Sequence, residues 1–387
     1  MVYLDNNAST KPAPEVVEAV CRVLAGLYGN PSSAHTPGKE AKAIIEEARF
    51  EVARLIGAVP EEIFFTSGGT ESNNIAIFGA VGETGRDKKH VIASSIEHPA
   101  ITNPLEYLKK AGGEITYLSV DRNGLVNPEA LKEALTENTV LVTIMHANNE
   151  TGVLQPIREL ASIARGKGVL FHTDAAQSVG KTPVNVERLG VDMLSIAGHK
   201  FHAPKGVGAL YIRKCMQGKI KNRVLFGAGH ERGMRPGTEN TPGIAGLAMA
   251  CRIAESVEQT TEKTEHLRDF LLALLKDAIA GIAVNGAGAA RLPNTLNVRI
   301  PGTDASGLVL ALADSVAFSA GSACHEGGKS ASRVLKAMGL TDDEAFCSVR
   351  ISLSRYTTRE ELKEAAALLQ KAVLQAGQGR SGLGSCP

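Results

Sequence analysis

Polar and titratable side chains follow several short runs of Val, Ile and Leu in this chain. They are His98 after residues 91–95, Asn149 after 139–145, Asp174 and Gln177 at the end of the run from 169, and His199 and Lys200 after 192–197. Such runs predict buried, mostly parallel strands, and ligands bind at the carboxyl edge of such a sheet. A helix cap or a surface charge explains any one of these residues. Their shared position favours a ligand site.

A glycine pair follows another predicted strand and leads into a predicted helix. The segment from Phe64 to Asn74 reads FFTSGGTESNN, with Gly68 and Gly69 ahead of Thr70. Backbone N–H groups at a helix start after such glycines, together with a hydroxyl, bind anions such as phosphate. Taken alone, the segment is explained equally well as a glycine turn with a threonine cap.

Taken together, these residues indicate one particular cofactor. Pyridoxal phosphate requires a lysine for its Schiff base, an acidic partner for its pyridinium nitrogen and a site for its phosphate. Lys200 and Asp174 supply the first two, and the segment at Gly69 and Thr70 supplies the third. The sequence therefore predicts a pyridoxal phosphate enzyme.

Composition excludes several other classes of protein. The chain has 387 residues, 43% of them hydrophobic, which suits two or three packed units and excludes wholesale disorder. A net charge of +1, 4% aromatic residues and the lack of Trp make nucleic acid and membranes unexpected partners. The six cysteines form no CxxC pair, so we expect neither disulfides nor a metal site. With no signal segment at the N-terminus, a cytoplasmic protein is expected.

Hydrophobic periodicity predicts an α/β fold. Apolar residues at steps of three and four predict a helix over 39–57, and Pro99 and Pro128 mark two further helix starts. Strands are expected at 63–67, 91–95, 114–120, 139–145, 169–174, 192–197 and 208–212. Beyond residue 255 the pattern predicts a charged helix over 256–278, short strands in LPNTLNVRI and VAFSA, and a last helix over 359–375.

Eight motifs in order resemble those of the cysteine desulfurases of the NifS/IscS group. They are TSGGTESNN, EHPA, HANNETGVLQPI, HTDAAQSVGK, AGHKFHAPKGVGALYIR, GHERGMRPGTENTP, SAGSACHEG and VRISLSRYTT, and the likeness runs from YLDNNAST to about residue 375. These proteins are class-V aminotransferases of fold type I. The resemblance implies a large domain over 15–255 with a mostly parallel seven-stranded sheet, and a small α+β domain formed by 1–14 and 256–375. The Gly/Ser-rich segment 376–387 is expected to be a disordered tail.

The resemblance also implies roles for single residues. Lys200 forms the Schiff base, Asp174 contacts the pyridine nitrogen, Gln177 bonds the ring hydroxyl, and His98 stacks on the ring and serves acid/base steps. The phosphate is held by Gly69, Thr70 and His199, with Thr238 reaching over from the partner subunit of a homodimer. Asn149 and Arg350 face the substrate. Arg350 suits a carboxylate because its planar fork binds both oxygens.

Cys324 distinguishes a desulfurase from other enzymes that use this cofactor. It lies in SAGSACHEGGK, where the neighbours are small and polar and where His325 and Lys329 favour a thiolate. By resemblance, Cys324 takes sulfur from L-cysteine as a persulfide, releases L-alanine and passes the sulfur to an acceptor protein, such as an iron–sulfur scaffold. We expect the other five cysteines to be structural or incidental.

Two departures from the family pattern bear on function. Ala197 stands where the family has a serine whose hydroxyl contacts the cofactor phosphate, which predicts weaker phosphate binding. The C-terminal segment lacks the acidic and aromatic ending of members dedicated to the housekeeping scaffold, which leaves a specialised sulfur acceptor open.

Other functions remain alternatives on the sequence alone. A selenocysteine lyase, a cysteine lyase without a persulfide and an aminotransferase use the same scaffold, and Cys324 argues against the last two. A non-catalytic assembly protein is the alternative from another class. The joint presence of Lys200, Asp174, His98 and Cys324 argues against it.

Overall fold

The computed structural model describes residues 1–82, 89–220, 223–325 and 328–381, without the side chains of 322–325, 328–329 and 377–381. The side chain of Cys324 and the residues Glu326 and Gly327 therefore lie outside the described part. Within that part, no helix is long and apolar enough to cross a membrane.

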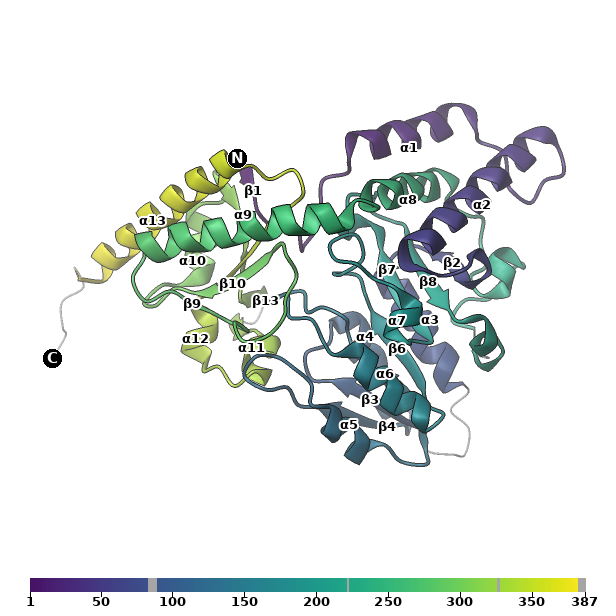
Figure 1. Cartoon of the computed structure of the whole chain (residues 1–387), viewed down its shortest axis with the longest axis horizontal. Helices are drawn as coiled ribbons and strands as arrows, with labels where there is room; N and C mark the ends of the chain where they lie inside the picture. Colours follow the sequence, from purple (N-terminus) through teal and green to yellow (C-terminus); the bar gives the residue numbers. More distant parts are fainter. Residues whose placement is uncertain (83–88, 221–222, 326–327, 382–387) are drawn as a thin grey trace.

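A seven-stranded sheet forms the centre of the larger part of the chain (Figure 1). Its order is β2-β8-β7-β6-β5-β3-β4, and only β8 runs against the other strands. The strands are β2 (Ile63–Thr66), β3 (His90–Ser94), β4 (Glu114–Leu118), β5 (Thr139–Thr143), β6 (Leu170–Asp174), β7 (Met193–Ala197) and β8 (Gly208–Ile212). The predicted α/β fold with a mostly parallel sheet is confirmed.

Hydrophobic side chains cover both faces of this sheet. Phe64 and Phe65 are successive residues of β2, yet they belong to two different apolar clusters, because successive side chains of a strand point to opposite faces. Helices α3 (Gly69–Val81) and α4 (Pro99–Lys110) pack in the cluster of Phe64. The cluster of Phe65 takes in α1 (Pro14–Gly26), α2 (Thr36–Ile56), α5 (Pro128–Ala134), α6 (Ile157–Gly166), α7 (Val186–Leu189) and α8 (Thr241–Ala254).

Short 3-10 helices connect several of these elements. They are η1 (Pro60–Glu62), η2 (Gly198–Lys200), η3 (Lys214–Lys219) and η4 (His230–Gly233). Of these, η2 matters most for the site, because it directly follows β7 and ends at Lys200.

The C-terminal part has a separate apolar cluster to which the first residues of the chain also belong. Its sheet has the order β12-β15-β10-β9, with β9 (Ala283–Val284), β10 (Thr295–Arg299), β12 (Ser319–Ala320) and β15 (Ser348–Ser352). The N-terminal β1 (Val2–Tyr3) pairs in parallel with β11 (Val316–Ala317), and β13 (Ser322–His325) forms a hairpin with β14 (Gly328–Ala331). The helices are α9 (Val257–Ala278), α10 (Ala305–Ala311), α11 (Arg333–Ala337), α12 (Asp342–Phe346) and α13 (Arg359–Ser381).

Two expectations differ from the structure in detail. Helix α13 continues to Ser381, whereas the sequence predicted its end at 375, so the first six residues of the expected tail are helical. Leu374 is the last strongly apolar residue of that helix, and hydrophobic periodicity cannot mark a helix end beyond it. The single strand expected in VAFSA is divided into β11 and β12, which pair with different partners. The domain boundaries stay a prediction.

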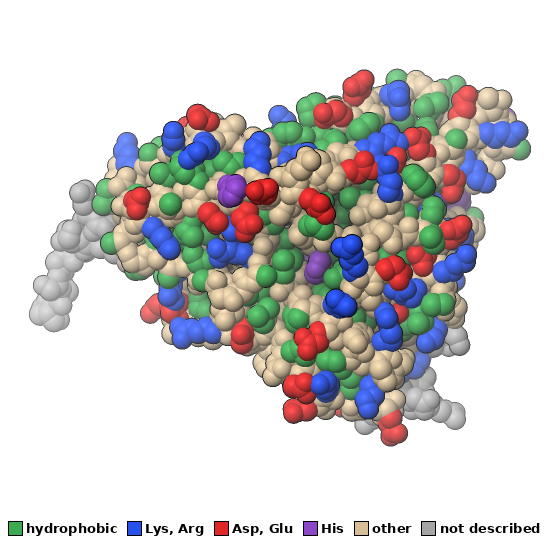
Figure 2. Space-filling view, viewed as in Figure 1, with side chains coloured by type: hydrophobic (Ala, Val, Ile, Leu, Met, Phe, Trp, Pro, Cys, Tyr) green, Lys and Arg blue, Asp and Glu red, His purple; other side chains and the backbone are tan. Residues whose placement is uncertain are grey.

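Positive and negative side chains are intermingled on the face shown in Figure 2. This mixture accords with the formal net charge of +1. The long helix α9 crosses this view and links the two parts of the chain (Figure 1).

Candidate active site

A cavity of about 450 Å³ lies where the predicted ligand-binding edge of the central sheet meets the N-terminal segment and β15. Segments distant in sequence line it, because six of the seven strands run in parallel and bring their carboxyl ends to one edge. The predicted site residues that line the cavity are Gly69, Thr70, His98, Asn149, Asp174, Gln177, His199, Lys200 and Arg350.

The start of α3 forms one wall of this cavity through Gly69 and Thr70. Gly68 adopts φ 150°, a backbone conformation that favours glycine. A Cβ on Gly69 would lie 3.3 Å from the Cβ of Ala197, so a larger residue would crowd this wall. Because the first N–H groups of a helix lack intrahelical partners, the wall can bind an anion. Nearby, Arg235 Nε donates to Glu71 Oε1 at 2.8 Å and ties the start of α3 to the segment before α8.

Lys200 is held at the cavity by the N-terminal segment. Its Nζ donates to the backbone oxygens of Asn7, at 2.7 Å, and Ala8, at 2.9 Å. The pKa of Lys200 is lowered from 10.5 to about 8, mainly by burial and then by the Arg350 cation, whereas Asp174 and Asp5 oppose the shift. A larger neutral fraction near pH 7 makes this amine a better nucleophile and base than an ordinary lysine.

Asp174 ends β6 and is a buried residue that lines the cavity. Its Oδ1 accepts from the backbone N–H of Ala176 at 2.9 Å, and its Oδ2 accepts from Asn73 Nδ2 at 2.7 Å. Asn73 comes from α3, so a second element fixes the orientation of the carboxyl group. The Oδ1 of Asn73 is buried and lacks a hydrogen-bond partner among the described residues.

Both histidines of the site favour the neutral form. His98 caps α4, where its Nδ1 accepts from the N–H of Ala100 at 3.1 Å, so the proton of its neutral ring is on Nε2. The ring is exposed in the open cavity, yet desolvation by the surrounding protein is the largest cause that lowers its pKa. Burial, and then the cations Lys200 and Lys205, lower the pKa of His199 to about 4.

Arg350, in the middle of β15, lines the cavity. Its Nη1 donates to the backbone oxygen of Asn149 at 3.1 Å, and its Nη2 donates to Asp5 Oδ1 at 2.7 Å and Ser319 Oγ at 2.8 Å. Its Nε is buried and has no partner among the described groups. A buried N–H without an acceptor costs free energy. An anionic group in the cavity would offset this cost.

Glu97 is a buried acid beside the site. Its Oε1 accepts from Ser94 Oγ at 2.5 Å and from the N–H of Met145 at 2.9 Å, whereas Oε2 has no partner within the described structure. Burial raises the pKa of Glu97 to about 8. With this pKa, the carboxyl group of Glu97 is mostly protonated at neutral pH.

Sequence reasoning missed three residues that hold the site together. Asn7 accepts from Lys200 and Gln177 through its backbone oxygen, Asn73 orients Asp174, and Lys181 donates to Gln177. All three lie inside motifs that carried the family resemblance, but spacing along the chain gives no sign that they meet. Only the folded structure places them together.

Two predicted residues do not line the cavity. Thr238 is exposed in the segment before α8. Cys324 lies in the β13–β14 hairpin, where its backbone pairs with that of Lys329, and its side chain lies outside the described residues. Their roles stay predictions.

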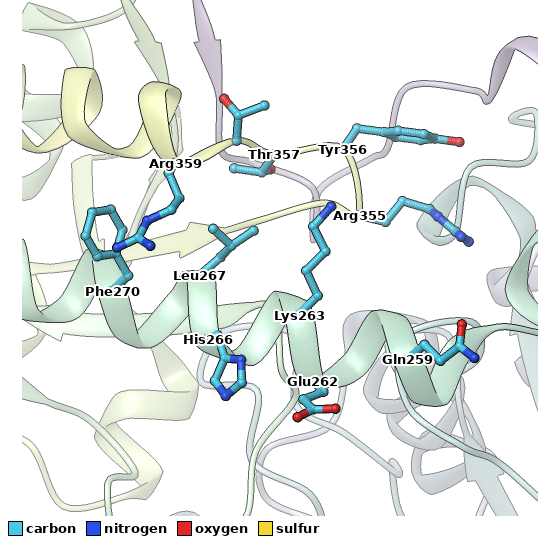
Figure 3. A pocket seen from close by; sticks show the side chains of 11 residues that line it. Gln259, Glu262, Lys263, His266, Leu267, Phe270, Arg355, Tyr356, Thr357 and Arg359 are labelled. Atoms are coloured by element: carbon cyan, nitrogen blue, oxygen red, sulfur yellow. The ribbon is translucent and has the colours of Figure 1, made fainter.

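A second, larger cavity of about 980 Å³ lies between α9 and residues 355–359. Figure 3 shows Lys263 and His266 on the helix and Arg355 and Tyr356 across the groove. Arg359 lies 4.1 Å from the ring centre of Phe270. None of the predicted site residues lines this groove, so the cavity at Lys200 is the candidate active site.

The family model for class-V aminotransferases matches residues 2–364. The chain therefore belongs to the class-V aminotransferase family, whose members depend on pyridoxal phosphate. Within it, the resemblance to cysteine desulfurases of the NifS/IscS group is confirmed by relatives over nearly the whole chain. The chain is 44% identical to the cysteine desulfurase IscS of Dictyoglomus turgidum over 374 residues, 96% of this chain and 94% of the relative. It is 42% identical to that of Serratia proteamaculans, over 96% of this chain and 92% of the relative.

Solved structures agree with this assignment. A NifS-like protein has a TM-score of 0.89 and 38% identity, and the match covers 97% of this chain and 99% of the other. SspA, solved in complex with cysteine, has a TM-score of 0.81 and 36% identity, and the match covers 92% of this chain and 100% of the other.

The residues present fit pyridoxal phosphate. A lysine amine, a carboxylate held by two donors and a helix start face one cavity. Arg350 lines the same cavity and offers a cation to an anionic substrate group. Lys200 would bind the aldehyde carbon, Asp174 the ring nitrogen, and Gly69, Thr70 and His199 the phosphate.

Proposed function

We propose that this protein is a cysteine desulfurase that converts L-cysteine to L-alanine and leaves the sulfur on Cys324 as a persulfide. The observation that supports it most directly is the meeting of Lys200, Asp174, His98 and Arg350 in one cavity. The relatives named cysteine desulfurase, and SspA with cysteine, support the choice of substrate.

Different residues of the cavity bind the substrate and transfer protons. Pyridoxal phosphate, when bound, supplies an electron sink for the pair left as the Cα–H bond breaks. Arg350 and Asn149 bind the substrate carboxylate. The neutral amine of Lys200 takes the Cα proton, which its lowered pKa favours near neutral pH. His98, with its proton on Nε2, donates or accepts protons beside it.

Sulfur transfer requires a nucleophile that can enter the cavity and leave it. The Cys324 thiolate attacks the sulfur of the substrate, the C–S bond breaks as the S–S bond forms, and the carbon fragment takes up protons to become alanine. We propose that the short β13–β14 hairpin that holds Cys324, which Gly321 joins to β12 and Ser332 joins to α11, carries the thiol into the cavity and out again.

We propose a homodimer in which Thr238 completes the phosphate site of the partner subunit. Its segment is anchored by Glu231, whose carboxylate accepts from both terminal nitrogens of Arg49 at 2.8 Å and from the N–H of Phe65 at 2.9 Å. The Arg235–Glu71 pair links the same segment to the start of α3. An exposed threonine at the end of a firmly held segment can reach a second subunit.

Iron–sulfur cluster assembly in the cytoplasm is the proposed setting, with a scaffold protein as sulfur acceptor. The thiols of Cys21, Cys215, Cys251 and Cys347 are free, as a reducing compartment requires.

The purified holoenzyme tests the proposal. With L-cysteine and a reductant it should release alanine and sulfide in equal amounts, and without a reductant mass spectrometry should find one extra sulfur on the peptide of Cys324. Pyruvate as the product would indicate a lyase instead. Activity confined to selenocysteine would indicate a selenocysteine lyase.

A further inference from the structure

Lys181 forms hydrogen bonds just outside the active-site cavity. Its half-buried Nζ donates to Gln177 Oε1 at 2.8 Å and to Asn7 Oδ1 at 3.0 Å. Lys181 does not line the main cavity but borders a separate space of about 30 Å³. Any effect that Lys181 has on a ligand through hydrogen bonds therefore passes through Gln177 or Asn7.

Two neighbours fix the orientation of the Gln177 amide. The backbone oxygen of Asn7 can only accept, so the Gln177 nitrogen that lies 2.9 Å from it must be the NH2 group. The carbonyl oxygen is then the atom that faces Lys181, which donates to it. Gln177 is buried and lines the cavity, so the two protein partners are the ones that orient its amide.

One donor of Gln177 remains for a ligand. Its NH2 group has two N–H bonds, of which Asn7 takes one, and Lys181 occupies the carbonyl oxygen. We infer that Lys181 is a positioning residue that turns Gln177 into a hydrogen-bond donor toward the cavity, so that the site favours a ring oxygen in its deprotonated form. This inference rests on the proposed function, because it takes pyridoxal phosphate as the ligand.

The charge around Lys181 is consistent with this role. Burial, and then the cations Lys200 and Arg350, lower the pKa of Lys181 well below its usual value. Both the ammonium and the neutral amine have N–H bonds to donate. The orientation of Gln177 is therefore the same in either protonation state.

The test is a pH titration of the visible absorption band of the holoenzyme with Lys181→Met. Loss of the Lys181 donor loosens Gln177 and disfavours the deprotonated ring oxygen. The spectral midpoint, which is the pH at which half of the absorption change has occurred, should therefore rise by about 0.5 to 1 pH unit. Cofactor loss during dialysis should be about 2- to 10-fold faster. Lys167→Met is the matched control, since Lys167 is exposed and is not among the groups that shift the pKa of Lys181, His199 or Lys200, so both values should stay unchanged.

A double-mutant cycle separates this role from a purely structural one. If Lys181 acts through Gln177, Lys181→Met should produce no further shift in the Gln177→Met background. Asn294 Nδ2 still donates to Asn7 Oδ1 at 3.1 Å in these variants, so Asn7 stays in place. A parental spectral midpoint in Lys181→Met, or equal shifts in both backgrounds, would overturn the inference.

A second variant tests the same inference if Lys181→Met does not fold. Lys181→Gln keeps an N–H donor, and its midpoint should stay closer to the parent than that of Gln177→Met. A midpoint equal to that of Gln177→Met would overturn the inference. The spectrum needs only bound cofactor, so a protein that binds cofactor but lacks desulfurase activity would refute the proposed function and leave this test intact.

Discussion

The rate at which the cofactor-free protein forms its Schiff base with added pyridoxal phosphate should depend on the protonation state of Lys200. Only the neutral amine attacks an aldehyde, and burial together with Arg350 lowers the pKa of Lys200 from 10.5 to about 8. At a pH of about 7.5, roughly a quarter of the molecules then have the neutral amine, against about one in a thousand for an ordinary lysine. The observed rate constant should therefore be about 200-fold higher than an unperturbed lysine would give.

Stopped-flow absorbance with saturating pyridoxal phosphate measures this rate across pH. We expect the rate constant to rise with pH and to reach half of its plateau near pH 8. Arg350→Gln should move the midpoint upward, because it removes a nearby cation and leaves Asp5 without its ion-pair partner. Exposed Arg333 is not among the groups that shift Lys200, so Arg333→Gln is the control.

The reasoning fails if the midpoint lies near that of free lysine, or if Arg350→Gln lowers it. A rate constant that does not change between pH 6 and 9 would mean that amine deprotonation does not limit capture. In that case, the hydrogen bonds of Lys200 to Asn7 and Ala8 would have to break first.

The same site supports three further predictions. Burial raises the pKa of Glu97 from 4.5 to about 8, so between these pH values the native state holds a proton that the unfolded state has lost. The free energy of unfolding should therefore fall as the pH rises from 4.5 to 8, by about 1.4 kcal/mol per pH unit at most. In chemical denaturation, Glu97→Gln should remove this dependence on pH. If the free energies of unfolding of the two proteins differ by the same amount at every pH in this range, the prediction is wrong. Ala197→Ser should slow cofactor loss in dialysis by about 2- to 10-fold if its hydroxyl donates to the phosphate, and equal loss would show that it does not. Cys324→Ser should keep the cofactor and bind cysteine yet release little alanine, whereas alanine release at the parental rate would favour a simple lyase.

Much of the fold could be predicted from local sequence pattern. The expected strands of the central sheet lie within two residues of the observed bounds, because each is a short apolar run bounded by helical or turn sequence. Pro99 and Pro128 start α4 and α5 as expected, since proline lacks only an N–H that has no partner there. The predicted end of α13 was wrong, because a polar helical turn looks like a flexible tail.

The residues that we propose to perform the chemistry could also be found in the sequence. Lys200, Asp174 and His98 lie at or just after the ends of strands that run in parallel, and a parallel sheet brings the carboxyl ends of its strands to one edge. Composition and spacing thus determined the cofactor class, and the motif around Cys324 determined the proposed chemistry.

Only the tertiary structure decided how these groups are held and tuned. Asn7 meets Lys200 across 193 positions of the chain and Gln177 across 170. The lowered pKa of Lys200 and the raised pKa of Glu97 both arise mainly from burial, which depends on how the whole chain packs around them. Local pattern specifies which side chains point toward an edge of a sheet. Desolvation and hydrogen-bond partners come from distant segments, so they exist only once the chain has folded.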